Sequence, residues 1–533
     1  MAKSLSIIIP VCNEVDTISD VIQSAKGLNP VEIIVVANGC NDGTEEVADR
    51  LGCKVIKYTE LLGNDVGRAV GAKHAIGDVL LFIDGDFVIQ TSKLQLFLNP
   101  ILHDQADIVL NNLDALFLKK QKPHSVTVWR QILNAMLESE ELKIDSLLSV
   151  PHALTKEVVQ SIGYECFVNP IVAHLRLVQS KWRISRHCAI DVITPNKFRP
   201  TEHAAYGTGL SHSEKRMIGD HIEAVAERIV GSDERGGYYD GNRKRDSVYH
   251  TLDFEDFYQG WGVTSNLYKG KQLSVIIPVQ DEEKTIGNVI EELRKIEPFE
   301  IIVVVNGSSD QTATIAKEKG ATTIVYKEAL GNDVGRSLGT YFAKGEIVLF
   351  IDGDFVIPAS ELYPFAKAIA DGTDVALNDL NHYLDLRVPL HLVTAFKYAL
   401  NLACDRKDLG VGSLIAVPNA FSRKCLKEIG YRSLLAPCVA QVKAILSGFE
   451  VACVSRVEVD KMNRIRPSEH FAKIGHPPAV LRIIGDHIEG LEQLIVLTGS
   501  RGGFHDGNRK GDVLFMNMHQ KQELSLFAEE LYR

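Results

Sequence analysis

The nine residues LFIDGDFVI occupy positions 81–89, and the same nine letters return at positions 349–357. Each copy begins as an apolar run, which is typical of a strand buried in a sheet, and continues into two aspartates separated by one glycine. Side chains alternate along an extended strand, so we expect Asp84 and Asp86 to point to the same side. Gly85 between them permits a close approach of the backbone to a neighbour.

Two carboxylates that face one point suit a hard divalent cation. Mg²⁺ and Mn²⁺ prefer oxygen ligands and typically keep phosphate oxygens in their remaining coordination positions. The sequence therefore predicts Mg²⁺ or Mn²⁺ at Asp84 and Asp86, and again at Asp352 and Asp354. The competing interpretation is a solvated turn, because Asp-Gly is a common turn-forming pair. The strand before each motif and the duplication favour the metal site.

The duplication extends far beyond this motif. Residues 5–14, LSIIIPVCNE, align with residues 273–282, LSVIIPVQDE. Further matches are IIVVANGCNDGT with IIVVVNGSSDQT, LGNDVGR with an identical copy, FRPTEH with IRPSEH, and RGGYYDGNRK with RGGFHDGNRK. The period is far longer than that of solenoid repeats, so each copy is expected to be a domain. We place the first domain at residues 1–258, a linker at 259–271 and the second domain at 272–533.

Strand and helix patterns alternate within each copy. In the first copy, the strand patterns LSIIIPV and EIIVVAN are followed by helical patterns near residues 15–26, 43–51 and 66–76. Continuous Val, Ile and Leu runs indicate a mostly parallel sheet with helices on both faces, and ligands of such sheets gather at the carboxyl ends of the strands. The predicted fold class is therefore α/β, with two tandem domains that arose by internal duplication.

Composition limits the classes of function. The chain has 533 residues, of which 45% are hydrophobic, enough for more than one core. The net charge of −11 and the lack of long basic blocks argue against a general nucleic-acid binder. Nine scattered cysteines without a C-x-x-C pair indicate reduced thiols. No apolar stretch reaches the roughly 18 residues of a membrane helix. We therefore expect a cytoplasmic protein without a transmembrane segment, and peripheral attachment to a membrane stays open.

Four motifs occur in the same order in both copies. They read PVCNE, NGCND, RAVG and DGD in the first copy, and PVQDE, NGSSD, RSLG and DGD in the second. This series resembles the nucleotide-sugar glycosyltransferases of the GT-A fold, especially the family-2-like group, strongly up to the DGD motif and more loosely beyond it. The resemblance implies two tandem GT-A domains with a Rossmann-like fold. It also implies transfer of a sugar from a nucleotide sugar, by default a UDP-sugar, to an acceptor.

The resemblance assigns roles to individual residues. It makes Asp86 and Asp354 the predicted catalytic aspartates, which bind the metal–diphosphate together with Asp84 and Asp352. The other predicted nucleotide-sugar-binding residues are Pro10, Glu14, Asn38, Asp42 and Arg68, with Pro278, Glu282, Asn306, Asp310 and Arg336 in the second copy. Polar groups at strand ends suit the base and ribose, and the planar fork of an arginine suits phosphate oxygens. Alternatively, Glu14 lies in a first helical turn and Arg68 on a helix surface, with no ligand.

The chain also resembles the glucosyl-3-phosphoglycerate synthases, retaining GT-A enzymes whose third metal ligand is the histidine of an H-x-x-R-P motif. The matching positions hold asparagine, Asn196 in NKFRP and Asn463 in NRIRP. His203 and His470, three residues after the proline, are the alternative third ligands. Neither copy has an acidic residue directly before the helix that follows the acceptor loop, and this favours retention of configuration over inversion.

The repeated RGG[YF]xDGNRK segment combines glycines with cations. Its basic residues are Arg235, Arg243 and Lys244 in the first copy and Arg501, Arg509 and Lys510 in the second. Such a segment is suited to close over a diphosphate or an anionic acceptor as a lid. A capped turn between helices is the alternative interpretation.

The predicted function is a metal-dependent glycosyltransferase with two catalytic domains. The acceptor is open between a small molecule, a glycan and a lipid-linked molecule. The acceptor loops differ, with ELKIDSLLSVPHA at 141–153 and DLGVGSLIAVPNA at 408–420, so the copies take different acceptors or one of them is weakened.

Three other functions compete with this prediction. One copy could be a non-catalytic domain that binds nucleotide sugar or regulates the other copy. A sugar nucleotidyltransferase is disfavoured, because no G-G-x-G-x-R-like loop follows the first strand. In a scaffold protein, the DGD motif would be only a turn.

Overall fold

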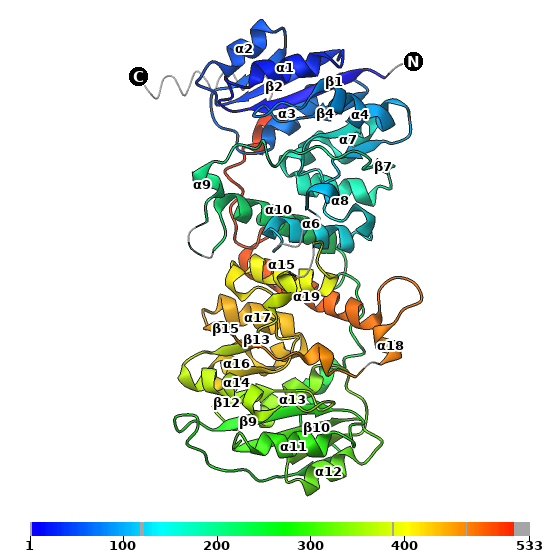
Figure 1. Ribbon diagram of the computed structural model, residues 1–533. Coiled ribbons are helices and arrows are strands. Elements are labelled where there is room, and N and C mark those ends of the chain that lie inside the picture. The colour runs from blue at the N-terminus through cyan, green and yellow to red at the C-terminus, as the bar shows by residue number, and fades with distance from the viewer. Residues whose placement is uncertain are drawn as a thin grey trace.

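The computed structural model describes residues 3–117, 122–205, 207, 209–385, 388–464 and 466–515. Two α/β halves are stacked along one axis, the first at the top and the second at the bottom of Figure 1. Each half contains one mostly parallel sheet, so the predicted tandem α/β fold is confirmed. The end of the predicted second domain, residues 516–533, lies outside the described residues.

The first sheet has seven strands in the order β3-β2-β1-β4-β6-β5-β7. They are β1 (Leu5–Val11), β2 (Glu32–Asn38), β3 (Lys54–Tyr58), β4 (Val79–Phe82), β5 (Ile108–Leu110), β6 (His152–Thr155) and β7 (Ile184–Ser185). β1 pairs in parallel with β2 and β4, whereas β6 runs antiparallel to both of its neighbours. Ile7 and Ile9 enter the core on one face of the sheet and Ile8 the core on the other. Burial on both faces explains why β1 is a continuous apolar run.

Helices cover both faces of the first sheet. The helices of this half are α1 (Ile18–Lys26), α2 (Thr44–Arg50), α3 (Val66–His74), α4 (Thr91–Leu102), α5 (Asp114–Phe117), α6 (Ser125–Met136), α7 (Lys156–Ile162), α8 (Pro170–Gln179), α9 (Pro200–His203) and α10 (His212–Ile229). α1 and α4 contribute to the core on one face, through residues such as Ile22 and Phe97. α3, α7 and α8 contribute to the core on the other, through residues such as Val66 and Ala173.

The second sheet has eight strands in the order β15-β13-β14-β12-β9-β10-β11-β8. They are β8 (Asp256–Tyr258), β9 (Leu273–Val279), β10 (Glu300–Asn306), β11 (Thr322–Tyr326), β12 (Ile347–Phe350), β13 (Val375–Asn378), β14 (Asn419–Ser422) and β15 (Val451–Ser455). The helices are α11 (Ile286–Arg294), α12 (Thr312–Glu318), α13 (Val334–Phe342), α14 (Ala359–Asp371), α15 (Leu392–Ala403), α16 (Arg423–Ile429), α17 (Pro437–Leu446), α18 (Pro467–His470) and α19 (Pro478–Thr498). None of the helices in the described ranges combines the length and apolarity needed to span a bilayer.

The two halves meet through helices rather than through their sheets. α6 and α10 of the first half pack against α15 and α19 of the second, at the centre of Figure 1. Trp129 and Ile222 share one buried apolar cluster with Phe396 and Ile488 from the other half. The halves are therefore joined by a common core.

After α10 the chain crosses to the opposite half. We call residues 233–258 the first tail. The amide of Lys244 donates to the carbonyl of Leu330 at 2.8 Å, and β8 pairs antiparallel with β11. Strand β8, which lies inside the predicted first domain, is thus the edge strand of the second sheet.

After α19 the chain crosses in the other direction. We call residues 501–515 the second tail, which runs as the red segment of Figure 1 from the lower half into the upper one. The amide of Lys510 donates to the carbonyl of Leu62 at 2.8 Å, and Leu514 is buried in a core of the first half. Each half is therefore completed by the tail of the other copy.

Candidate functional site

Polar side chains gather at the carboxyl ends of β1, β2 and β4, where parallel strands end at the same edge of the sheet. Glu14 follows β1, Asp42 follows β2, and Asp84 and Asp86 follow β4. The first two loops are joined, because Asp42 accepts a hydrogen bond from the amide of Val15 at 3.0 Å. The second half repeats this contact between the equivalent residues. The predicted site edge is thus built in the same way twice.

Glycine holds the paired aspartates close to the first strand of each half. A Cβ atom at Gly85 would lie 2.5 Å from Cγ1 of Val11, and one at Gly353 would lie 2.3 Å from Cγ1 of Val279. Neither distance leaves room for a methyl group, so only glycine allows this packing. The hydroxyl of Thr17 donates to the carbonyl of Gly85 at 2.7 Å and fixes the turn.

The first aspartate of each pair holds a buried arginine. Nη2 of Arg68 lies 3.1 Å from Oδ1 of Asp84, and its Nη1 lies 2.9 Å from Oδ1 of Asp65. In the second half, the equivalent arginine lies 3.2 Å from the first aspartate of its pair. Burial raises the pKa of Asp84; Arg68 opposes this shift and the charge of Asp86 adds to it. Arg68 is therefore a buried cation of the site and not a surface arginine.

The second aspartate of each pair faces an arginine that the sequence analysis did not select. Nη2 of Arg199 lies 3.3 Å from Oδ2 of Asp86 and 2.9 Å from Oε1 of Glu14. Arg466 makes the same two contacts in the second half, both at 3.1 Å. Burial raises the pKa of Glu14, and the nearby charge of Asp86 adds to this shift. The sequence contains a signal for these arginines, because the arginine is repeated in FRPTEH and IRPSEH. The sequence analysis interpreted only the residues next to it.

One buried oxygen of each second aspartate has no hydrogen-bond partner within the described part of the chain. These atoms are Oδ1 of Asp86 and Oδ1 of Asp354. A buried carboxylate oxygen without a donor is costly unless a ligand supplies positive charge. Together with the neighbouring first aspartate, it offers the oxygen ligands that a hard cation prefers. The residues present therefore fit a site for Mg²⁺ or Mn²⁺.

Several predicted donor-binding residues support the loops of this edge. Nδ2 of Asn38 donates to the carbonyl of Gly63 at 3.2 Å, and Asn306 makes the equivalent contact at 3.2 Å. Pro10 and Pro278 are the next-to-last residues of β1 and β9. These contacts place all four residues at the site edge, and their contact with a nucleotide stays a prediction.

The predicted third metal ligands lie on the segment that carries the newly found arginines. His203 and His470 each accept a hydrogen bond at 2.9 Å from the amide of the arginine four residues earlier. Asn196 and Asn463 are exposed, and within the described residues the side chains that donate to Asp86 and Asp354 are those of Arg199 and Arg466. The choice between asparagine and histidine stays a prediction.

The six basic residues predicted to form a lid pair with carboxylates of the opposite half. The pairs are Arg235 with Asp486 and Glu489, Arg243 with Asp333 and Asp486, Lys244 with Glu328, Arg501 with Asp220 and Glu223, Arg509 with Asp65 and Asp220, and Lys510 with Glu60. Direct contact of these residues with a ligand stays a prediction.

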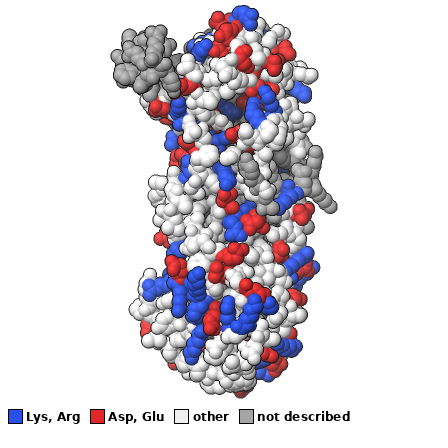
Figure 2. Space-filling view, turned by 90° about the vertical axis from the view of Figure 1, so that its left-hand side faces the viewer, with Lys and Arg blue, Asp and Glu red and all other residues white. Residues whose placement is uncertain are grey.

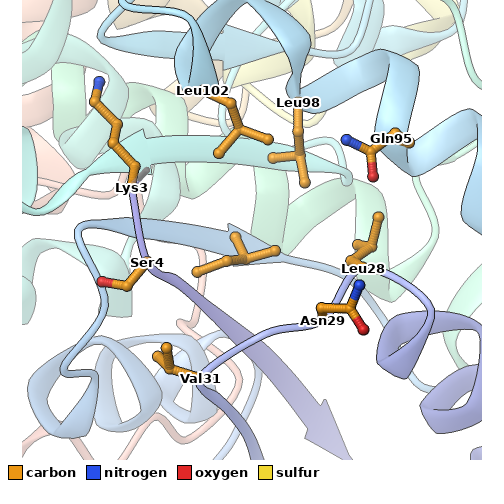
Figure 3. Close-up of a pocket in the computed structure, with 9 residues that line it drawn as sticks. Lys3, Ser4, Leu28, Asn29, Val31, Gln95, Leu98 and Leu102 are labelled. Atoms are coloured by element: carbon orange, nitrogen blue, oxygen red, sulfur yellow. The ribbon is translucent and has the colours of Figure 1, made fainter. Parts of the chain in front are cut away.

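A surface hollow lies at the opposite end of the first strand. It is lined by Ser4, which directly precedes β1, by Leu28 and by Leu98 of α4, as Figure 3 shows. The paired aspartates lie beyond the carboxyl ends of the strands, so this hollow is not part of the candidate site. On the face shown in Figure 2, basic and acidic side chains are interspersed over both halves.

The model of the family described as "Glycosyl transferase family 2" matches residues 6–153 and 274–430, which together exceed half of the chain. A glucosyl-3-phosphoglycerate synthase of Mycobacterium tuberculosis is 30% identical over 155 residues, which are 26% of this chain and 45% of the relative. A 4,4'-diaponeurosporenoate glycosyltransferase of Staphylococcus aureus is 34% identical over 93 residues, 16% of this chain and 25% of the relative. The chain thus spans less than half of the length of these curated relatives.

A solved structure was also compared with the chain. The glucosyl-3-phosphoglycerate synthase of Mycobacterium tuberculosis, crystallised with Mn²⁺, UDP-glucose and phosphoglyceric acid, has a TM-score of 0.33 and 20% sequence identity. The comparison covers 42% of this chain and 79% of that one.

Proposed function

Since the chain belongs to glycosyl transferase family 2, we propose that each of its halves transfers a sugar from a nucleotide sugar to an acceptor, with Mg²⁺ or Mn²⁺ as cofactor. The donor that we favour, from the sequence resemblance, is a UDP-sugar. The observation that carries the proposal is the repeated aspartate pair. In both halves the first aspartate holds a buried arginine, and the second presents a buried oxygen that receives no hydrogen bond from any described residue.

The roles of the side chains follow from their placement. Asp84 and Asp86 would hold the cation in the first half, and Asp352 and Asp354 would hold it in the second. When bound, such a cation counters the charge of the nucleoside diphosphate that leaves as the glycosidic bond breaks. Arg68 adds a fixed positive charge beside the pair, and its planar guanidinium matches phosphate oxygens.

The acceptors of the two halves are proposed to differ. In the first half, the loop before β6 takes part in an ion cluster: Asp145 of this loop pairs at 2.6 Å with Arg186, which follows β7, and Arg186 pairs at 2.7 Å with Asp114 of α5. Lys143 joins the cluster through Asp114 at 2.7 Å. The aligned residues of the second half are uncharged: Asn381 for Asp114, Gly410 for Lys143, Gly412 for Asp145 and Cys453 for Arg186.

The equivalent loop of the second half lies next to the proposed donor site, because Nη1 of Arg336 donates to the carbonyl of Leu414 at 3.3 Å. The second half lacks all four charges of the cluster, as expected if the two loops bind acceptors of different polarity. A charged acceptor suits the first half better than the second.

A second candidate function is that only one half transfers sugar and the other merely binds the donor. The second half lacks the ion cluster, which favours a role in donor binding alone for residues 272–515. Its aspartate pair is intact, which favours turnover of the donor. Single-site variants decide between the two, since a binding half retains metal-dependent affinity for the donor without releasing nucleotide.

The proposal is tested by a donor-hydrolysis screen. UDP-, GDP- and ADP-sugars are incubated with the full chain and with Mn²⁺ or Mg²⁺, and the released nucleotide is identified. The control is the double variant Asp86→Asn/Asp354→Asn, which lacks one carboxylate in each half. Metal-dependent release by the wild type and not by the control supports the proposal. Equal release by both proteins contradicts it.

A further inference from the structure

The two tails dock on equivalent places of the opposite halves. The docking place is the segment LGNDVGR, identical in both copies at residues 62–68 and 330–336. A Cβ atom at Gly63 would lie 2.9 Å from Cα of Arg509, and one at Gly331 would lie 2.7 Å from Cα of Arg243. Both glycines have a φ of +83°, which also disfavours other residues there. The loop is therefore shaped to receive a tail that comes from the other copy.

Each tail arginine continues into a chain of alternating charges that ends at the aspartate pair. In the first half, Nη2 of Arg509 lies 2.9 Å from Oδ2 of Asp65. The other oxygen of Asp65 lies 2.9 Å from Nη1 of Arg68. Nη2 of Arg68 in turn lies 3.1 Å from Oδ1 of Asp84.

The second half contains the same chain with the roles of the copies exchanged. Arg243 lies 2.7 Å from Asp333, which lies 3.2 Å from Arg336, which lies 3.2 Å from Asp352. The arginine at the start of each chain of charges thus comes from the copy that does not contain the aspartate pair at its end.

The tail arginines are anchored by a second carboxylate. Arg509 also pairs with Asp220 on α10, and Arg243 pairs with Asp486 on α19 at 2.7 Å. The side chain of Arg243 is 0% exposed and that of Arg509 is 4% exposed. Removal of one partner from a buried ion pair leaves an uncompensated charge, so these arginines determine where Asp65 and Asp333 can lie.

We propose that Arg509 positions the donor site of the first half and Arg243 positions that of the second, each acting from the opposite copy through Asp65 or Asp333. They are positioning residues, since neither touches the aspartate pair. The inference rests on the proposed function for its effect on sugar transfer. Its structural part, the control of one site by the other copy, does not depend on that function.

The test uses the full chain with one aspartate pair disabled. Asp354→Asn leaves the first site to be measured, and Asp86→Asn leaves the second. Arg509→Ala and Arg243→Ala are added to each background, and the probe is Mn²⁺ with UDP, titrated by calorimetry. Loss of a partner that hydrogen-bonds a metal ligand typically weakens metal affinity about 10- to 100-fold. The tail arginines act further out, through two intervening residues, so the lower end, about tenfold, is the expected loss. We expect this loss from Arg509→Ala only in the Asp354→Asn background, and from Arg243→Ala only in the Asp86→Asn background.

The opposite pattern, equal losses in both backgrounds, or no loss in either would overturn the proposal. Conservative variants guard against misfolding: Asp65→Asn and Asp333→Asn cut the chain of charges while the tails stay anchored at Asp220 and Asp486. They are expected to reproduce the loss at the first and the second site, respectively. Retained affinity in both of them would likewise overturn it.

Arg245→Ala is the matched control. Arg245 lies in the first tail and pairs with Glu489 and Asp240, not with Asp333. The second tail has Gly511 at the equivalent position, so docking of a tail does not require this arginine. We expect less than about a threefold change in Mn²⁺–UDP affinity, because Arg245 is partly exposed and the buried Glu489 keeps Arg235 as a partner at 2.9 Å. A loss as large as that of Arg243→Ala would assign the effect to general loosening of the tail and overturn the proposal.

Hydrogen exchange separates this inference from the proposed function. If neither background binds Mn²⁺ and UDP, the proposed function fails, and amide exchange still tests the positioning. Arg509→Ala should then accelerate exchange in residues 62–71 and not in residues 330–339, and Arg243→Ala should do the reverse. Exchange that rises equally in both segments would overturn the inference.

Discussion

Nη2 of Arg466 lies 3.1 Å from Oδ2 of Asp354, and the same contact between Arg199 and Asp86 measures 3.3 Å in the first half. A divalent cation held by either aspartate has to share the carboxylate with this guanidinium. In the proposed metal site, the arginine would therefore compete with the cation before the donor binds. The arginine of each pair is partly exposed and the carboxylate is mostly buried, so solvent screens the pair from the arginine side only.

The first prediction concerns this competition. Arg199→Gln in the Asp354→Asn background should strengthen binding of Mn²⁺ alone about two- to fivefold, since the partly exposed guanidinium limits the pair to about 1 kcal/mol. Calorimetric titration without nucleotide measures it. Lys197→Gln is the control, because Lys197 is mostly exposed and lies 3.8 Å from Glu14. Weaker Mn²⁺ binding by Arg199→Gln would show that the arginine supports the cation instead.

The second prediction concerns the independence of the two aspartate pairs. Asp86→Asn and Asp354→Asn should each lower donor turnover at their own half by more than about 100-fold, beyond the loss caused by outer partners. Total nucleotide release should fall only in part in each single variant and vanish in the double variant. Complete loss in either single variant would mean that the halves do not turn over separately.

The third prediction concerns removal of the metal. UDP should raise the midpoint of thermal unfolding only when Mn²⁺ or Mg²⁺ is present, because in the proposed site the diphosphate binds through the cation. At a ligand concentration of 100 Kd the stabilisation is about 2.7 kcal/mol. Scanning fluorimetry with and without EDTA measures it, and re-addition of Mn²⁺ is the control. A shift that survives EDTA would contradict a cation between aspartates and diphosphate.

The fourth prediction concerns the glycine between the aspartates. Gly85→Ala should lower the free energy of unfolding by about 1–3 kcal/mol through overpacking against Val11, and should weaken Mn²⁺ binding at the first site. Chemical denaturation and calorimetry measure the two effects. Gly511→Ala is the control, since its Cβ would lie 3.6 Å from Val168, an ordinary contact. Unchanged Mn²⁺ affinity in Gly85→Ala would separate the glycine from the site.

The fold was predictable where the physical signal is local. The apolar runs that end at Asp84 and Asp352 could be recognised as buried strands, and the parallel pairing of β4 and β12 with the first strands is confirmed. β6 was not foreseen as an antiparallel member of the sheet. A run of four residues does not reveal its direction, which is decided by pairing with strands far away in the sequence.

Local sequence patterns could not predict which residues from distant parts of the chain contact the site. Arg199 follows Asp86 by 113 residues, and only the folded chain brings them together. The crossing of the tails was equally hidden, for a different reason. Both copies carry the same docking loop, LGNDVGR. The sequence therefore does not distinguish a tail that docks on its own copy from one that docks on the other copy.

The fifth prediction concerns pH and a buried histidine that differs between the halves. Burial lowers the pKa of His174 to about 3, and its Nε2 contacts Oδ1 of Asn134 at 2.8 Å. A group with a depressed pKa stabilises the fold above its unfolded pKa, near 6.5, and this stability is lost as the pH falls. The second half has Gln441 at this position, which donates to Asn401 at 2.7 Å.

His174→Gln should therefore reduce the sensitivity to acid. Between pH 7.5 and 5.5 the wild type should lose about 1.4 kcal/mol of unfolding free energy through this histidine, and the variant should not. Urea unfolding at the two pH values measures the difference. The reciprocal variant Gln441→His serves as the control and should increase the loss. Parallel pH profiles for wild type and His174→Gln would refute the assignment.

The exchange of tails also determines what happens when the peptide between the copies is cut. A protease that cleaves near Val263, an exposed residue, would produce two fragments that remain bound to each other through both tails. The nicked protein should elute from a sizing column as one particle and fall apart only in denaturant. By the same logic, two shorter genes that encode residues 1–262 and 263–533 should yield a heterodimer when expressed together, and poorly folded products when expressed alone.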